Sequence, residues 1–138
     1  MASCVFCRIV AGELPSARIY EDDKTVAFLD INPIVRGHAL VLTRDHYEGV
    51  DDIPEQLLRE LAASVKKVAR SVKQGMNAEG VNILLNNGRC SGQIVPHIHF
   101  HVIPRSTNDG VAFQWSPRQY SSSELDEVAA RIRKAHGA

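Results

Sequence analysis

The chain has 138 residues, 44% of them hydrophobic, with 16 basic and 16 acidic side chains. This length predicts one domain over residues 1–138, burying about two thirds of its unfolded surface. The balanced charge argues against a nucleic-acid partner, because non-specific duplex binding depends on clustered Lys and Arg. No stretch approaches the roughly 20 apolar residues that cross a bilayer, and no secretory signal is apparent. The sequence therefore predicts a cytoplasmic protein with no membrane partner.

The first two thirds of the chain read as short strands separated by turn residues. The expected strands are 18–21, 25–30, 38–43, 81–86 and 97–104. Apolar residues recur at helical spacing from Pro54 to Gln74, and Gly75 marks the stop. Because strands joined by short turns pair antiparallel, we expect an α+β fold with an antiparallel sheet and its helices on one face.

The C-terminal part, residues 106–138, is expected to form a loop and a second helix from about Ser122 to Ala135. Ser121 and Glu124 have the spacing of a capping box at its start. The loop from Ser106 to Tyr120 is long for a compact domain, and such loops often carry function. Two interpretations stay open. In the first, Trp115 anchors this loop near the active site or near a partner subunit. In the second, Trp115 covers the second helix of its own chain.

The cysteines Cys4, Cys7 and Cys90 are an odd set for a disulfide framework, and Cys4-x-x-Cys7 is typical of metal or redox sites. A thioredoxin-like motif follows a strand, but only three residues precede Cys4. We therefore favour half of a tetrahedral zinc site, completed by histidines distant in the sequence. A reduced cysteine pair without metal is the alternative.

Residues 97–103 alternate histidine with apolar side chains, which on a strand would place His97, His99 and His101 on one face. Three interpretations compete. In the first, this face of the strand is a polar surface without a chemical role. In the second, the three imidazoles bind a catalytic metal, and in the third the middle imidazole is a nucleophile that its neighbours assist.

This run resembles the signature of the histidine triad (HIT) superfamily of nucleotide hydrolases and transferases. Other segments resemble the family in the same order, over about residues 4–105. They are Val5-Phe6-Cys7-Arg8-Ile9, Gly12-Glu13-Leu14-Pro15-Ser16, Glu21-Asp22, Ala27-Phe28-Leu29-Asp30-Ile31-Asn32-Pro33, Gly37-His38, Asn86 and Gly92-Gln93. The resemblance implies a five-stranded antiparallel sheet with two helices and a two-fold homodimer.

The resemblance to zinc-containing members implies a metal site made of Cys4, Cys7, His46 and His97. Four protein ligands leave no open position for water, so the zinc would be structural and would not take part in the chemical step.

The resemblance also implies a mechanism. His99 would attack the α-phosphate of a nucleotide and form a nucleotidyl-histidine that water hydrolyses. His101 and loop amides around Gly92 would stabilise charge, Gln93 would contact the phosphate chain near the leaving group, and His38 would support the triad. A neutral imidazole has a lone pair and needs no separate base for this attack.

The family positions that bind the nucleoside and phosphate are also present. The residues concerned are Phe6, Ile9, Phe28 and Ile31 for the base, Asp30 for the ribose, and Asn86, Gly92 and Gln93 for the phosphate. Taken alone, Phe6 and Phe28 would be interpreted as core residues, and Asp30 as a turn former.

One position departs from the family pattern. Many family phosphoramidases carry a hydroxyl residue after the glutamine, but this chain has Ile94, which cannot donate a proton to a leaving group. We therefore favour dinucleoside polyphosphates or nucleoside phosphate esters and anhydrides over phosphoramidates. The alternative function is a nucleotide-binding regulatory protein with incidental slow hydrolysis, and a metal-dependent hydrolase is a third possibility.

Overall fold

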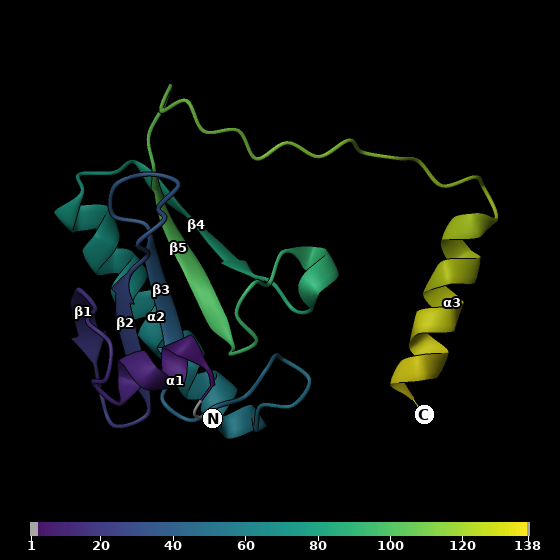
Figure 1. The fold of residues 1–138 in the computed structure, drawn as a ribbon. Helices are drawn as coiled ribbons and strands as arrows, with labels where there is room; N and C mark the ends of the chain where they lie inside the picture. Colours follow the sequence, from purple (N-terminus) through teal and green to yellow (C-terminus); the bar gives the residue numbers. More distant parts are fainter. Residues whose placement is uncertain (1–2, 138) are drawn as a thin grey trace.

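The computed structural model describes residues 3–137. Five strands form one antiparallel sheet in the order β1-β2-β3-β5-β4. The elements are α1 (Val5–Val10), β1 (Arg18–Glu21), β2 (Thr25–Leu29), β3 (Ala39–Thr43), α2 (Glu55–Gly75), β4 (Gly80–Leu85), the 3₁₀ turn η1 (Arg89–Ser91), β5 (His99–Arg105) and α3 (Glu124–His136) (Figure 1). The predicted α+β class and all five strands are confirmed.

Each face of the sheet buries its own apolar cluster. Ala27 of β2 and Val41 of β3 pack with the apolar stripe of α2, whereas Phe28 and Leu40 point to the opposite face and pack with α1. This alternation follows from the two-residue period of a strand. The central strand β3 is buried along its whole length because both of its faces are covered.

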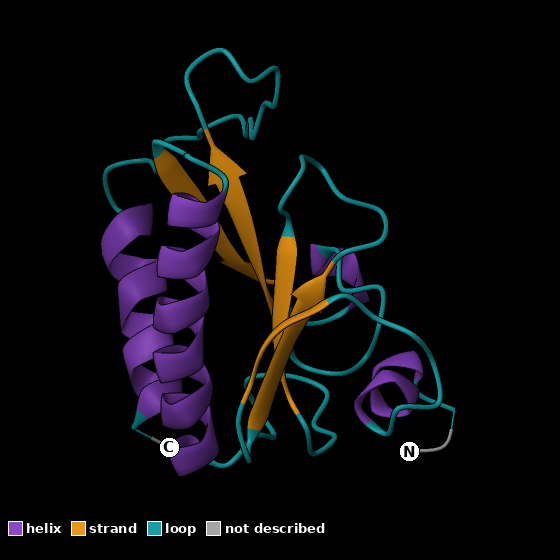
Figure 2. Cartoon of the chain, turned by 90° about the vertical axis from the view of Figure 1, so that its left-hand side faces the viewer, coloured by secondary structure: helices purple, strands orange, loops and turns teal. Residues whose placement is uncertain are grey.

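The prediction that the helices cover one face is wrong. Figure 2 shows α1 and α2 on opposite sides of the sheet. Helix α1 was not predicted, because its six residues are too few to show a helical period. The long helix was predicted within one residue at each end, and Pro54 occupies its N-cap. In residues 3–137 there are thus three α-helices where two were expected.

The fifth strand begins at His99, two residues later than predicted. The chain turns at Pro96, where the N–H of His97 donates to the carbonyl of Val95 at 2.8 Å. His97 therefore precedes the strand and does not share its regular alternation.

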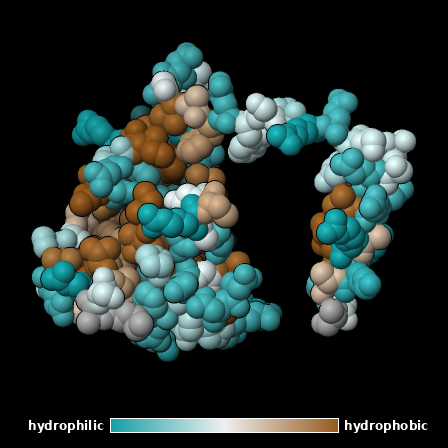
Figure 3. All heavy atoms as spheres, turned by 45° about the vertical axis from the view of Figure 1, so that its right-hand side comes forward, coloured by the Kyte–Doolittle hydropathy of each residue, from teal (hydrophilic) through white to brown (hydrophobic). Residues whose placement is uncertain are grey.

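The C-terminal part leaves the sheet as an extended arm, residues 111–123, that ends in α3 (Figure 1). The start of the arm is held by Arg105. Its guanidinium donates two hydrogen bonds to the carboxylate of Asp109, at 2.7 and 3.0 Å, and lies over the ring of Phe113. The apolar stripe of α3, which contains Leu125 and Ile132, faces the gap between the helix and the domain (Figure 3), and these two residues are 56% and 65% exposed. Trp115 is 83% exposed, so it does not cover α3.

The predicted capping box of α3 does not form. The helix starts at Glu124 with Ser123 as its N-cap, and the Ser121 hydroxyl instead contacts the Glu124 carboxylate at 3.4 Å. In the described part of the chain, no helix has the length and apolar character needed to span a membrane.

The turn between β1 and β2 is organised by the carboxylate of Asp22. One of its oxygens accepts the backbone N–H groups of Lys24 and Thr25 at 2.9 and 2.7 Å. The other accepts the hydroxyl of Tyr20 at 2.8 Å and that of Ser64 on α2 at 3.3 Å. Burial alone would raise the pKa of Asp22, but these hydrogen bonds outweigh it and lower the pKa to about 2.

Replacing this carboxylate tests its contribution to stability. We expect Asp22→Asn to lower the free energy of unfolding at neutral pH by about 2 kcal/mol, because the charged acceptor is lost. The folded pKa lies below the unfolded value of about 3.9, so the stabilisation is present above that pH and is lost as pH falls towards about 2. Thermal unfolding across this range should show the gap between wild type and variant closing. A constant gap, or an equal effect of Asp23→Asn, would contradict the assignment.

Candidate functional site

The imidazole of His99 is held in one tautomer by the backbone. Its Nδ1 lies 2.6 Å from the carbonyl oxygen of His97, which can only accept, so Nδ1 carries the proton. The lone pair is therefore on Nε2. Burial lowers the pKa of His99 below its ordinary value, so this nitrogen is unprotonated at neutral pH. His99 is thus a neutral imidazole of fixed orientation, with the properties that the predicted nucleophile needs.

The tautomer of His101 is fixed by a second chain of hydrogen bonds. The N–H of Ile34 donates to Nδ1 of His38 at 3.1 Å, which leaves the proton of His38 on Nε2. That Nε2–H donates to Nδ1 of His101 at 3.0 Å. The remaining nitrogen of His101, Nε2, therefore carries a proton and is a donor. Burial lowers the pKa of His101 to about 4, with the nearby His99 and His38 adding to the effect.

The aromatic residues predicted to bind a base lie beside His99. The ring of Phe6 on α1 meets the ring of Phe28 edge-on at 5.6 Å and that of His99 at 5.0 Å. Ile9 packs against the same cluster. Ile31, which was also predicted to contact the base, is 89% exposed. The structure therefore brings α1 and the end of β2 together next to His99.

Asp30 lies at the end of β2 next to the histidine chain. One of its carboxylate oxygens accepts the N–H of Asn32 at 2.8 Å, and the other lies 3.7 Å from Nε2 of His38. Burial lowers the pKa of His38, and the charge of Asp30 opposes this effect. This position leaves acceptor capacity on Asp30 for a further donor.

The predicted phosphate loop, residues 86–93, forms several hydrogen bonds between its own residues. The N–H of Gly92 donates to the carbonyl of Arg89 at 3.1 Å, so it is used inside the loop. Gly92 has a φ of +105°, a backbone conformation that favours glycine. A Cβ at this position would lie 3.4 Å from Nδ2 of the Asn86 side chain. In this arrangement Gly92 shapes the loop, and the Asn86 side chain lies against it.

Gln93 is buried and has two partners. Its Oε1 accepts the N–H of Gly88 at 2.8 Å, and its Nε2 donates to the carbonyl of Glu48 at 2.6 Å. The predicted contact of Gln93 with a phosphate chain would have to use its remaining N–H, since both of these bonds hold the loop in place. Ile94, the next residue, is 79% exposed.

The four residues expected to bind zinc come together at the start of α1. Sγ of Cys4 lies 3.5 Å from Nδ1 of His97, and Sγ of Cys7 lies 3.4 Å from Nδ1 of His46 and 3.6 Å from that of His97. Nε2 of His97 donates to the carbonyl of Thr43 at 2.7 Å, which leaves Nδ1 free to bind a cation. Burial lowers the pKa of His97 to about 4, so its imidazole is neutral.

These distances fit a tetrahedral zinc site. With Zn–S bonds of about 2.3 Å and Zn–N bonds of about 2.0 Å, the sulfur–nitrogen edges of a tetrahedron are about 3.5 Å. The three sulfur–nitrogen separations given above match this value. The contact of His97 with Thr43 is also the kind of backbone hydrogen bond that orients metal-binding imidazoles.

Sequence reasoning missed the residues that act through their backbone. The carbonyls of Thr43, Glu48 and His97 each fix a side chain of the site. A carbonyl is present at every position of a chain, so residue type carries no signal for such a role. The side chain of Asn87, which accepts the N–H of Val50 at 2.7 Å, was also not singled out.

Comparison with known proteins agrees with this geometry. The HIT domain family model matches residues 11–108. The chain belongs to the HIT family. An uncharacterized HIT-like protein of Methanocaldococcus jannaschii is 42% identical, covering 94% of this chain and 98% of that protein. An adenosine 5'-monophosphoramidase of Candida albicans is 36% identical over 96% and 91% of the two chains. An adenylylsulfatase of Arabidopsis thaliana is 33% identical over 94% of this chain and 65% of its own length.

Solved structures of HIT proteins share the fold. A HIT family protein of Bacillus subtilis is 38% identical, with a TM-score of 0.89 over 96% of both chains. A HIT protein of Mycobacterium smegmatis, described as zinc-bound, is 39% identical, with a TM-score of 0.77 over 97% of this chain and 98% of that one. The expected family and fold are thereby confirmed, and the family match extends three residues beyond the predicted C-terminal limit.

Proposed function

We propose that this HIT protein is a hydrolase, or nucleotidyl transferase, that acts at the α-phosphate of a nucleotide through a covalent intermediate on His99. The observation that carries the proposal is the hydrogen bond from Nδ1 of His99 to the carbonyl of His97, which leaves Nε2 as a ready nucleophile. The relatives named adenosine 5'-monophosphoramidase and adenylylsulfatase support the substrate class.

The reaction has two steps at phosphorus. Nε2 of His99 forms a bond to the α-phosphorus as the bond to the leaving group breaks on the opposite side. Water then attacks the same phosphorus, and the electron pair of the P–N bond returns to Nε2, which releases the nucleoside monophosphate. Each step inverts the phosphorus, so the configuration is retained overall. The histidine needs no deprotonation, because its lone pair is already present.

His101 supplies the main charge-stabilising donor in this scheme. Its Nε2–H, fixed by the chain from Ile34 through His38, can donate to a non-bridging oxygen of the α-phosphate. Phe6 and Phe28 form the inner wall of the base site, Asp30 accepts from the ribose hydroxyls, and the amide of Asn86 is a second donor for the phosphate.

Ile94 favours substrates whose leaving group is already a stable anion. Ile94 is an exposed apolar side chain next to Gln93, and it has no proton to give to a departing amine. We therefore place anhydrides, including dinucleoside polyphosphates, and those esters whose leaving group is an acidic alcohol, ahead of phosphoramidates.

Replacing the nucleophile tests the proposed function directly. His99→Asn should keep the fold and bind AMP within about twofold of wild type, while turnover of an adenosine dinucleotide falls by several orders of magnitude, because the covalent step has no substitute. His101→Ala should lower the rate by about 10²–10³, as expected for a lost charge-stabilising donor. The exposed His136→Asn serves as the control. Turnover by His99→Asn near the wild-type rate would refute the mechanism.

We also propose a structural zinc ion at Cys4, Cys7, His46 and His97. The close spacing of the four donor atoms, which all lie within 4.8 Å of one another, and the zinc-bound relative support it. When bound, the ion would join α1 to the turn before β5. The reaction requires no cofactor in this scheme.

Metal content tests this site. We expect about one zinc per chain, and Cys7→Ser should lose it together with thermal stability, because structural zinc couples binding to folding. The exposed Cys90→Ser is the matched control and should retain the metal. Elemental analysis of reduced, chelator-free protein gives the answer. Wild-type protein without zinc, or a Cys7→Ser variant that keeps it, would contradict the assignment.

We further propose a homodimer in which the arm and α3 contact the partner subunit. The apolar stripe of α3 is exposed in the single chain, as is Trp115. The close match of the Bacillus subtilis structure over 96% of this chain supports the extended placement of the arm. A second copy of this chain is the partner that such a stripe would need.

The arm prediction concerns Trp115. Trp115→Ala should weaken dimerisation or change the preference among nucleotide substrates, because a large aromatic surface is removed from the contact. Sedimentation over a concentration series and rates with several nucleotides measure both. The control is Met76→Ala, an exposed apolar residue on the domain itself. If Trp115→Ala behaves as the control does, Trp115 and the arm contribute neither to dimerisation nor to substrate preference.

A further inference from the structure

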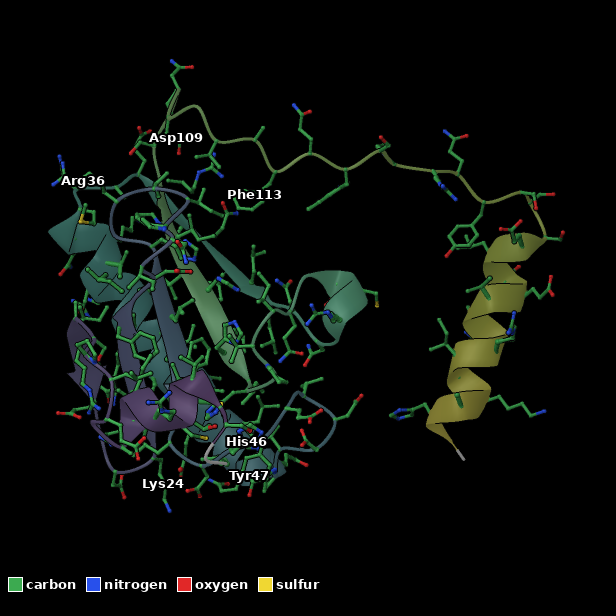
Figure 4. All side chains as sticks on the ribbon, viewed as in Figure 1. Lys24, Arg36, His46, Tyr47, Asp109 and Phe113 are labelled. Carbon is green, nitrogen blue, oxygen red and sulfur yellow. The ribbon has the colours of Figure 1, made fainter. Side chains whose placement is uncertain are left out.

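The segment 46–52, called here the strap, connects β3 to α2 and touches two parts of the site. Its first residue, His46, belongs to the Cys/His cluster. Figure 4 shows His46 and Tyr47 at the end of the domain that carries α1. The carbonyl of Tyr47 accepts the N–H of Ile98 at 2.7 Å, so the strap is also bonded to the residue between His97 and His99.

The middle of the strap holds the phosphate loop through two hydrogen bonds. The carbonyl of Glu48 accepts from the buried amide of Gln93 at 2.6 Å, and the N–H of Val50 donates to Asn87 at 2.7 Å. Gln93 in turn holds Gly88 of the same loop. Both ends of the loop 86–93 are therefore fixed to the strap rather than to the sheet alone.

Gly49 allows this close approach. A Cβ at this position would lie 2.8 Å from Oδ1 of Asn87, closer than such atoms come in proteins. The strap is also stiff, because the carboxylate of Asp52 accepts the N–H groups of Glu48 and Gly49 at 3.1 and 2.9 Å. These bonds hold residues 48–52 together, and the bond from Ile98 to the carbonyl of Tyr47 ties the strap to the chain just before β5, so a movement of His46 is expected to reach Glu48 and Gly49.

We propose that the strap is a positioning device which couples metal binding at the Cys/His cluster to the placement of the phosphate loop, residues 86–93. In this arrangement Gly49 and Asn87 are positioning residues that touch neither the metal nor the reacting atoms. The inference rests on the proposed function for its effect on rate, whereas the coupling itself is a property of the fold.

The test compares zinc-loaded wild type with Gly49→Ala and Asn87→Ala, which break the same contact from opposite sides. Gly75→Ala is the matched control, since a Cβ there meets nothing within 4 Å. Hydrogen exchange of residues 86–93, zinc content, AMP affinity and turnover of an adenosine dinucleotide are measured. Both strap variants should exchange faster in the loop and lose about 10–100-fold in kcat. Zinc content and AMP affinity should stay within about twofold of wild type.

Zinc removal completes the test. Chelation should speed exchange of residues 86–93 in the wild type, with little further change in Gly49→Ala, because the coupling is already broken there. Exchange in α2 serves as the internal reference. Wild-type exchange that does not respond to zinc, or protein that binds none, would overturn the metal coupling. Strap variants that match Gly75→Ala in exchange and kcat would overturn the positioning role. If the wild type forms no nucleotidyl-histidine, the proposed function fails, but the exchange result still decides the coupling.

Discussion

The site depends on the hydrogen bond between Nδ1 of His99 and the carbonyl of His97. That bond decides which nitrogen of His99 has the lone pair, and the carbonyl is oriented by the turn that Pro96 starts. The ring of His97 faces the cysteines, and its other nitrogen is bonded to Thr43 on the central strand. His97 therefore connects the sheet, the Cys/His cluster and His99, which explains why these features lie so close together.

Much of the fold could be predicted because its signals are local and periodic. The apolar stripe of α2 and the alternation in the strands report directly which face is buried. The pairing of Cys4 and Cys7 with His46 and His97 was expected from the family resemblance, and the structure places these four side chains together. Residue type identifies such a cluster because few side chains bind zinc.

The rest depends on contacts that residue type does not report. The short α1 takes its place from packing of Phe6 on the opposite face of the sheet, not from a helical period. The alternation of histidines suggested that His97 lies within the strand, but the turn at Pro96 removes it. The C-terminal helix was predicted from its sequence, yet it does not pack on its own domain, because the contacts of Arg105 with Asp109 and Phe113 direct the arm away from the sheet.

The most direct test is to locate the covalent intermediate. Wild-type protein is mixed with an adenosine dinucleotide, quenched under conditions that preserve phosphoramidate bonds, and mapped by mass spectrometry of its peptides. We predict one adenylyl group on the peptide containing residues 97–103, assigned to His99 by fragmentation and to Nε2 by ³¹P–¹⁵N NMR. Hydrolysis that proceeds without any adduct, or an adduct on another residue, would contradict the account.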